Sequence, residues 1–382
     1  MKVLFITRGY PSPDDPMAGN YEAVQARAIA AKGHEVSVIG IKWLSLRHVF
    51  TSTKVSHRVV DGINVYEATK VYPGIRYINL PKWERFTKTW IFRKVFNKYV
   101  KECGMPDIVH VHIILYAPPA VFLKTKYNLP FVITEHWSKM NTEKLEMRVR
   151  NQTFAYRYAD RVICVSDALA ERLRNKCNVD SLVINNMVSD QFFESCKIER
   201  NDREIRFVGV GALRKDKRFD MLVEAFALCH FPEQVRLDII GDGEERLLIE
   251  SKIKEFNVGG QVRLLGVRTS EEVNKLLCQS DCFVLSSRSE TFAIVVIEAM
   301  AKGLPVIATR CGGPETFVRP EDGLLVEKEN AKELAKALKY MAGHYQEYNA
   351  DEIRQHCHDN FSQGVIADKI IDVYRQVIRS IV

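Results

Sequence analysis

The sequence predicts an α/β protein made of two Rossmann-like domains, and three observations lead to this prediction. The chain has 382 residues, enough for two domains that each bury a core of their own. An apolar strand, a helix and a second strand open the chain within residues 2–39, and another apolar strand over residues 205–211 opens a similar pattern halfway along. Strands that alternate with helical segments are typical of parallel sheets covered by helices.

The composition is that of an ordinary globular protein. Apolar residues make up 46% and charged residues 27%, and no apolar run approaches the ~18 residues of a membrane span. The first residues contain one lysine and a short apolar run, which favours a buried strand over a secretory signal. Nine cysteines are scattered without the spacing of a zinc site, so we expect reduced thiols in a cytoplasmic protein.

Charge is unevenly divided along the chain. Residues 1–190 contain 28 basic and 17 acidic residues, a formal charge of +11, whereas the remainder carries −4 within the total of +7. A basic half beside a mildly acidic half indicates an anionic surface or substrate on one side.

The stretch over residues 282–314 carries the most specific functional pattern. An apolar strand, a loop with Glu290, an apolar helix with Glu298 and a further strand predict a βαβ unit. Ligands of open parallel sheets bind beyond the carboxyl ends of the strands, where a helix N-terminus suits a phosphate. We therefore expect a phosphate to meet the backbone N–H groups of residues 291–295, which are Thr291, Phe292, Ala293, Ile294 and Val295.

The two glutamates extend this prediction to a sugar nucleotide. A carboxylate does not suit a phosphate, but it accepts hydrogen bonds from sugar hydroxyls. Glu298 lies in an otherwise apolar helical face, where an unpaired carboxylate is costly. The alternative is that Glu290 only complements the helix dipole and Glu298 is a solvated helix residue.

The segment SETFAIVVIEAMAKGLPVIAT resembles the Glu–seven residues–Glu signature of the retaining glycosyltransferases of family 4, which have the GT-B fold. Thr291 and Ala293 stand where that family commonly has glycine. The resemblance extends over nearly the whole chain and implies two Rossmann-like domains that face a cleft. Its expected parts are an acceptor-binding domain over residues 1–188, a nucleotide-sugar-binding domain over 189–364, and a C-terminal helix over 365–382 that returns to the first domain.

The resemblance also implies a reaction. A sugar would pass from a nucleotide-sugar donor to a hydroxyl of a glycan or lipid-linked acceptor, in cell-surface polysaccharide or glycolipid synthesis. Family membership implies retention of anomeric configuration and no obligatory metal, and we expect no cofactor besides the donor substrate. Glu290 would hold the donor sugar and Glu298 the ribose.

A cationic loop follows the strand over residues 205–211. It predicts a clamp for a diphosphate, unless it is simply a solvated loop. The family usually carries Gly-Arg-Leu here, with a lysine five residues after the arginine. Lys217 matches that lysine, Ala212 takes the place of the arginine, and Arg214 is the candidate substitute.

Three residues of the first half complete the predicted site. Gly19, just before the first helix, permits close approach of a ligand, although it is also an ordinary turn residue. His112 and His136 follow the carboxyl ends of two predicted strands, where an α/β sheet places its ligands. In family 4 the second of these strands commonly ends in a histidine that faces sugar and acceptor, so His136 joins Lys217 and Glu290 as a catalytic candidate. His112 is a weaker acceptor-side candidate.

Residues 76–101 interleave aromatic side chains with eight basic residues and a single acid. From residue 82 onward the aromatic residues follow a helical period. A basic amphipathic helix of this kind predicts contact with an anionic membrane, here at the inner face, or else an aromatic side in the core and a solvated basic side. No nucleic-acid-binding motif accompanies it, so we expect no nucleic acid partner.

Three alternatives to the transferase remain open. A nucleotide-sugar epimerase uses the same fold. A catalytically silent nucleotide-sugar-binding subunit would account for Ala212. A NAD-dependent oxidoreductase is disfavoured because the chain lacks GxGxxG after its first strand.

Overall fold

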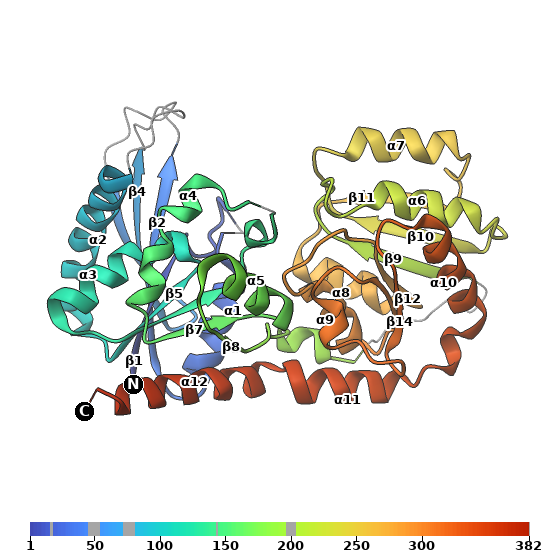
Figure 1. Ribbon diagram of the computed structural model, residues 1–382. Helices are drawn as coiled ribbons and strands as arrows, with labels where there is room; N and C mark the ends of the chain where they lie inside the picture. The colour runs from blue at the N-terminus through green and yellow to red at the C-terminus, as the bar shows by residue number, and fades with distance from the viewer. Residues whose placement is uncertain (16–17, 45–53, 72–80, 143, 196–203, 382) are drawn as a thin grey trace. The chain divides into compact units, whose positions relative to one another are not determined.

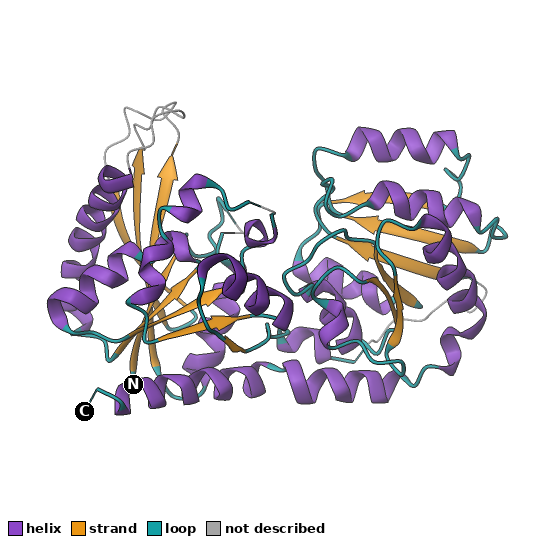
Figure 2. Ribbon diagram, viewed as in Figure 1, coloured by secondary structure: helices purple, strands orange, loops and turns teal. Residues whose placement is uncertain are grey.

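The computed structural model describes residues 1–15, 18–44, 54–71, 81–142, 144–195 and 204–381. The chain forms two compact units, the first from residues 1–185 together with 363 onward, the second from residues 186–362 (Figure 1). Each unit contains one sheet with helices around it, and all strand pairs but one are parallel (Figure 2). The predicted pair of Rossmann-like domains is therefore confirmed. The chain passes from one unit to the other after residues 185 and 362, a few residues before the predicted boundaries at 188 and 364.

The sheet of the first unit has the order β3-β4-β2-β1-β5-β6-β7-β8, with only β3 and β4 antiparallel. β1 lies between β2 and β5, so the strand order reverses there, which is where such sheets bind ligands. The strands are β1 (Lys2–Thr7), β2 (Glu35–Leu44), β3 (Lys54–Val60), β4 (Ile63–Val71), β5 (Ile108–His112), β6 (Phe131–Glu135), β7 (Arg161–Cys164) and β8 (Leu182–Val183).

The helices of the first unit include the last long helix of the chain, α12. It contacts α1, and Lys32 Nζ lies 2.7 Å from Asp368 Oδ2 across that contact. The predicted return of the C-terminal helix is therefore confirmed. The helices are α1 (Asn20–Ala31), α2 (Pro81–Cys103), α3 (Pro118–Tyr127), α4 (Met147–Arg150), α5 (Asp167–Cys177) and α12 (Gln363–Arg379), with short 3₁₀ helices η2 (Ile114–Tyr116), η3 (Ser138–Asn141) and η4 (Thr153–Arg157).

The sheet of the second unit is parallel throughout, in the order β11-β10-β9-β12-β13-β14. Its order reverses at β9, which lies between β10 and β12. The strands are β9 (Ile205–Val210), β10 (Val235–Ile240), β11 (Val262–Gly266), β12 (Cys282–Leu285), β13 (Val306–Thr309) and β14 (Gly323–Val326). The helices are α6 (Phe219–Leu228), α7 (Arg246–Glu255), α8 (Ser270–Cys278), α9 (Ile294–Ala301), α10 (Ala331–His344) and α11 (Ala350–Phe361), with 3₁₀ helices η5 (Asp190–Phe193), η6 (Pro314–Thr316) and η7 (Tyr345–Glu347).

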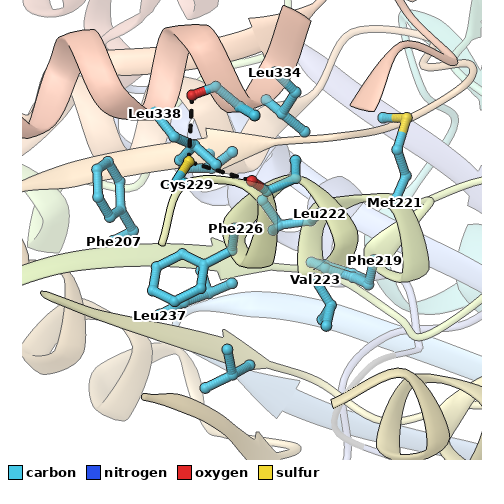
Figure 3. Close-up of a cluster of buried hydrophobic side chains, with 14 of the residues drawn as sticks. Phe207, Phe219, Met221, Leu222, Val223, Phe226, Cys229, Leu237, Leu334 and Leu338 are labelled. Carbon is cyan, nitrogen blue, oxygen red and sulfur yellow. Dashed lines mark hydrogen bonds between the residues drawn. The ribbon is translucent and has the colours of Figure 1, made fainter. Parts of the chain in front are cut away.

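A dense apolar core fixes α6 and α10 to this second sheet (Figure 3). Phe226 and Leu338 are almost entirely buried, and side chains of this kind contribute roughly 1.5–3 kcal/mol each. The Cys229 thiol donates to the carbonyl oxygens of Ala225 at 3.2 Å and Ala335 at 3.3 Å, which joins the end of α6 to α10. The loops at the strand ends therefore stand on a rigid base.

Helix α2 confirms that some of its aromatic residues face the core, while its contact with a membrane stays a prediction. Phe92, Phe96 and Tyr99 are buried, as the core-facing alternative predicts, whereas Trp90 is 40% exposed. Residues 76–80 lie outside the described part of the chain, and the side chains of residues 81–88 are not described either. Among the described helices, none is long and apolar enough to cross a membrane.

The expectation of reduced thiols is wrong at one position. Cys278 takes part in a disulfide whose partner lies outside the described residues. The other described cysteines are free thiols, and most are buried.

Candidate functional site

In the second unit, the loops that follow β9 and β12 are bonded to each other at the point where the strand order reverses. The Arg288 N–H donates to the Asp216 carbonyl at 2.8 Å, and the Ser286 hydroxyl donates to the Lys217 carbonyl at 2.9 Å. Two segments about seventy residues apart in sequence thus form one surface at the carboxyl edge of the sheet.

Lys217 and Glu290, predicted separately, form an ion pair on that surface. Lys217 Nζ lies 2.5 Å from Glu290 Oε1, and the Ser287 hydroxyl donates to the same oxygen at 2.7 Å. Both side chains are mostly buried, where a charge-assisted hydrogen bond is strong. No hydrogen bond from a described residue reaches Glu290 Oε2, which leaves this oxygen to accept from a ligand hydroxyl.

Helix α9 begins at Ile294, three residues later than the first predicted N–H donor. Ala293 is its N-cap and has left-handed backbone angles, φ 76° and ψ 65°, which explains why a glycine is favoured at such a position. The Phe292 side chain is buried and packs on Phe317, with ring centroids 4.9 Å apart, so only its backbone is available to a ligand. The first-turn N–H groups, at Ile294 and Val295, have no partner within the helix.

Glu298 lies on α9 without a hydrogen bond or ion pair to any described residue. Although its side chain keeps some exposed surface, removal from water raises the pKa of its carboxyl to about 7. A carboxyl group in this position is destabilising unless something pairs with it. Glu298 is therefore an acceptor that a ligand hydroxyl can satisfy.

Arg214, the candidate substitute for the missing arginine, is oriented differently from Lys217. Its guanidinium donates to Asp216 at 2.8 Å, and its side chain is 44% exposed. Thr291 is partly exposed in the loop before α9.

In the first unit, Gly19 is the N-cap of α1 and has a left-handed φ of 64°. A Cβ added to Gly19 would lie 2.2 Å from the Gly9 carbonyl oxygen. Gly19 thus lies close to the protein's own loop after β1, and its predicted approach to a ligand stays a prediction.

His112 and His136 are neighbours at the carboxyl ends of β5 and β6, with ring centroids 5.6 Å apart. His136 Nε2 lies 4.0 Å from Glu22 Oε1, and the ring also contacts Tyr21. His112 is fully buried, and neither of its ring nitrogens has a hydrogen-bond partner among the described residues. Burial lowers the pKa of His112 well below its usual value, so this imidazole is neutral at pH 7.

Several contacts around these histidines have no simple sequence signature. His110 stacks on His112 at 4.4 Å and is bonded through Nδ1 to the Tyr374 hydroxyl, 2.5 Å away on α12. Burial lowers the pKa of His110 to about 3. Glu135 was also missed; the one available signal was a charged residue in the last position of a buried strand. Among the described residues, no three His, Cys, Asp or Glu side chains form a group suited to a metal ion.

Two Rossmann-like units, each with its strand order reversed at a central strand, are the architecture of the GT-B fold. The chain belongs to glycosyltransferase family 4. The description "Glycosyltransferase Family 4" matches residues 19–192, and "Glycosyl transferases group 1" matches residues 190–360.

Relatives and solved structures agree with this assignment. An uncharacterized glycosyltransferase, MJ1178 of Methanocaldococcus jannaschii, is 30% identical over 80% of this chain and 85% of its own length. The putative teichuronic acid biosynthesis glycosyltransferase TuaC of Bacillus subtilis is 29% identical over 88% of both chains. Sucrose-phosphate synthase from Thermosynechococcus elongatus superposes with a TM-score of 0.78 over 100% of both chains at 21% identity. Anabaena HepE in complex with UDP superposes with a TM-score of 0.72 over 98% of this chain and 100% of its own, at 17% identity. The two structural likenesses show the fold alone.

Proposed function

We propose that the protein transfers a sugar from a nucleotide-sugar donor to an acceptor hydroxyl, with retention of anomeric configuration and without an obligatory metal. The observation that carries the proposal is the Lys217–Glu290 pair beside the N-terminus of α9, with the unpartnered Glu298 on the same helix. Cationic, N–H and carboxyl groups at one edge suit a diphosphate flanked by sugar hydroxyls. The UDP complex of HepE, a protein of the same fold, is consistent with this ligand class.

Each residue has a defined role in this proposal. Lys217 and the N–H groups of residues 291–295 stabilise the leaving diphosphate as its negative charge develops. Glu290 Oε2 accepts from the donor sugar, and Glu298 accepts from the ribose. Arg214 is an additional donor-side cation if its pair with Asp216 opens, and Gly19 keeps the loop after β1 in place. His136 and His112 lie on the acceptor side, and His136 is the catalytic candidate of the two.

A thermal-shift panel tests the donor proposal. UDP, GDP, ADP and their common sugar conjugates are each added to the full chain. A ligand that binds only the folded state stabilises it by roughly 2.7 kcal/mol at a hundredfold excess over Kd. We expect one nucleotide to raise Tm clearly. No shift with any of them would contradict the proposal, whereas a shift without transfer to any acceptor would favour the silent subunit. Conversion of the sugar without an acceptor would favour the epimerase.

We further propose that the acceptor is a glycan or lipid-linked molecule of cell-surface polysaccharide or glycolipid synthesis, and that α2 and α3 contact an anionic membrane at its inner, cytoplasmic face. Lys94 Nζ lies 4.0 Å from the centre of the Trp90 ring, and Lys126 Nζ lies 4.9 Å from that of Tyr127. Trp90 and Tyr127 are 40% and 38% exposed, and the two helices contact each other. Exposed aromatic rings beside cations suit the interface of a bilayer.

Co-sedimentation with vesicles rich in an anionic lipid tests this surface. We expect the wild type to bind at low salt and Lys94→Glu to lower the partition coefficient by at least tenfold. The reversal removes an attraction of about 1 kcal/mol and adds a repulsion of similar size. Tyr340→Ala, which removes a similarly exposed aromatic ring from α10, should have no effect. A wild type that stays in the supernatant at low salt would contradict the membrane proposal.

A further inference from the structure

We propose that Glu135 is a positioning residue that holds the loops after β5 and β6 together, and thereby sets the relative placement of His112 and His136. The inference deepens the proposed function, since it concerns the acceptor-side histidines, but its geometry does not depend on that function. The carboxyl end of β6 supplies both Glu135 and His136, and β5 supplies His112.

The Glu135 carboxylate joins three segments of the first unit. Its Oε2 accepts from the Ile114 N–H at 3.1 Å and from the Tyr156 hydroxyl at 3.0 Å, and its Oε1 accepts from the Trp137 N–H at 3.1 Å. Ile114 follows His112 by two residues, and Trp137 follows His136 directly. One carboxylate therefore fixes the backbone just beyond each histidine, with η4 as the third point of attachment.

The backbone between His112 and Ile114 is strained. Ile113 has φ 68° and ψ 131°, a combination that L-residues rarely adopt and that a β-branched side chain makes less favourable still. Such a residue costs about 1–3 kcal/mol and persists only where its surroundings force it. Here the Ile113 N–H donates to the Thr134 carbonyl at 2.9 Å while the next N–H donates to Glu135. The end of β6 thus dictates how the chain turns after His112.

Burial explains why this carboxylate is not merely a packing residue. Glu135 is fully buried, and loss of water raises the pKa of its carboxyl against the opposing effects of its three donors and of the neighbouring His136. Buried ionic groups are often replaceable by apolar ones without loss of stability. Their use is clearest where they specify one arrangement among several, and strain of the Ile113 kind clusters at sites of function.

Histidine ring spectra test the placement directly. The full chain is labelled with ¹⁵N-histidine, and wild type is compared with Glu135→Gln, whose amide NH₂ cannot accept a hydrogen bond. We expect the ring signals of His112 and His136 to move while those of His344 and His358, in the second unit, stay in place. Tyr156→Phe, which removes one donor and keeps the carboxylate, should move the same two signals less. Glu146→Gln is the matched control, because Glu146 is an exposed partner of Lys139 in the same region.

Kinetics distinguish positioning from general stability. In a transfer assay we expect Glu135→Gln to lower kcat by tenfold or more while the donor KM and the nucleotide-induced thermal shift stay within twofold. Unmoved signals of His112 and His136 in a folded Glu135→Gln protein would overturn the inference. So would a uniform movement of all histidine signals with equal loss of kcat and donor binding, because that result describes a destabilised fold. The spectra need no turnover, so an inactive wild type would end the proposed function without deciding this one.

Discussion

Replacing Lys217 with methionine should lower kcat for sugar transfer by about 10²–10³-fold, because it removes a preorganised cation from the site where the leaving group gains charge. It should also destabilise the second unit. Glu290 is only 8% exposed, and breaking a buried ion pair by removing one partner costs about 3–5 kcal/mol. Urea unfolding measures the second effect and initial-rate kinetics the first.

A double variant separates the two effects of Lys217. Lys217→Met combined with Glu290→Gln leaves no unpaired charge, so most of the lost stability should return while transfer stays at the low level. Arg214→Met is the control for the stability measurement alone, since the Arg214 pair with Asp216 is exposed and such pairs are worth about 0–1 kcal/mol. Normal transfer by a folded Lys217→Met protein would contradict the proposed role of this lysine.

Replacing Glu298 with glutamine should stabilise the free protein and weaken nucleotide binding at the same time. The folded-state pKa of Glu298 is raised to about 7 from 4.5. Below pH 4.5 the carboxyl is protonated in both states and has no effect on stability. As pH rises from 4.5 to 7 the unfolded chain releases its proton first, so the wild type loses stability across this window. Because the side chain is only partly buried, we expect the free energy of unfolding of Glu298→Gln to exceed that of the wild type by about 1–3 kcal/mol at pH 8.

The measurement is the free energy of unfolding at pH 4.5 and pH 8, with and without the nucleotide that shifts Tm. Glu298→Gln should be more stable than the wild type at pH 8 and equally stable at pH 4.5. It should also lose most of the nucleotide-induced stabilisation. Glu224→Gln, at an exposed position on α6, should behave as wild type throughout. A variant that is less stable at pH 8 yet binds nucleotide normally would show that Glu298 has a packing role.

Most of the parallel strands were predictable because they are short apolar runs with polar or glycine residues at their ends. The β3–β4 hairpin over residues 54–71 was missed because it lacks the continuous apolar run of the other strands. Its available signals were the alternation of apolar and polar residues and the Asp61-Gly62 turn, where both residues have positive φ. Helices α10 and α11 and strand β14 were not predicted either, and none of the predicted site residues lies in them.

The candidate site was predictable in its residue types and not in its contacts. The spacing of Glu290 and Glu298 and the position of Lys217 could be read along the chain. The bond between Lys217 and Glu290 joins positions 73 apart, and only the order of strands β9 and β12 brings their loops together. Likewise, nothing in the sequence near Glu135 predicts that the Ile114 N–H and the Tyr156 hydroxyl donate hydrogen bonds to its carboxylate. Arg214 was predicted to bind a ligand phosphate, but its guanidinium instead pairs with Asp216, two residues further along the chain.

The path of the chain between its two units bears on how the protein is made. The second unit is one uninterrupted segment, whereas the first is completed by helix α12, whose Tyr374 supplies the hydroxyl bonded to the buried His110. Domains generally fold as units during synthesis, with the N-terminal one first. In this chain the first unit cannot be completed in that order, because α12 is translated after the whole second unit. Until α12 has been made, the buried His110 lacks the hydroxyl of Tyr374 as its partner.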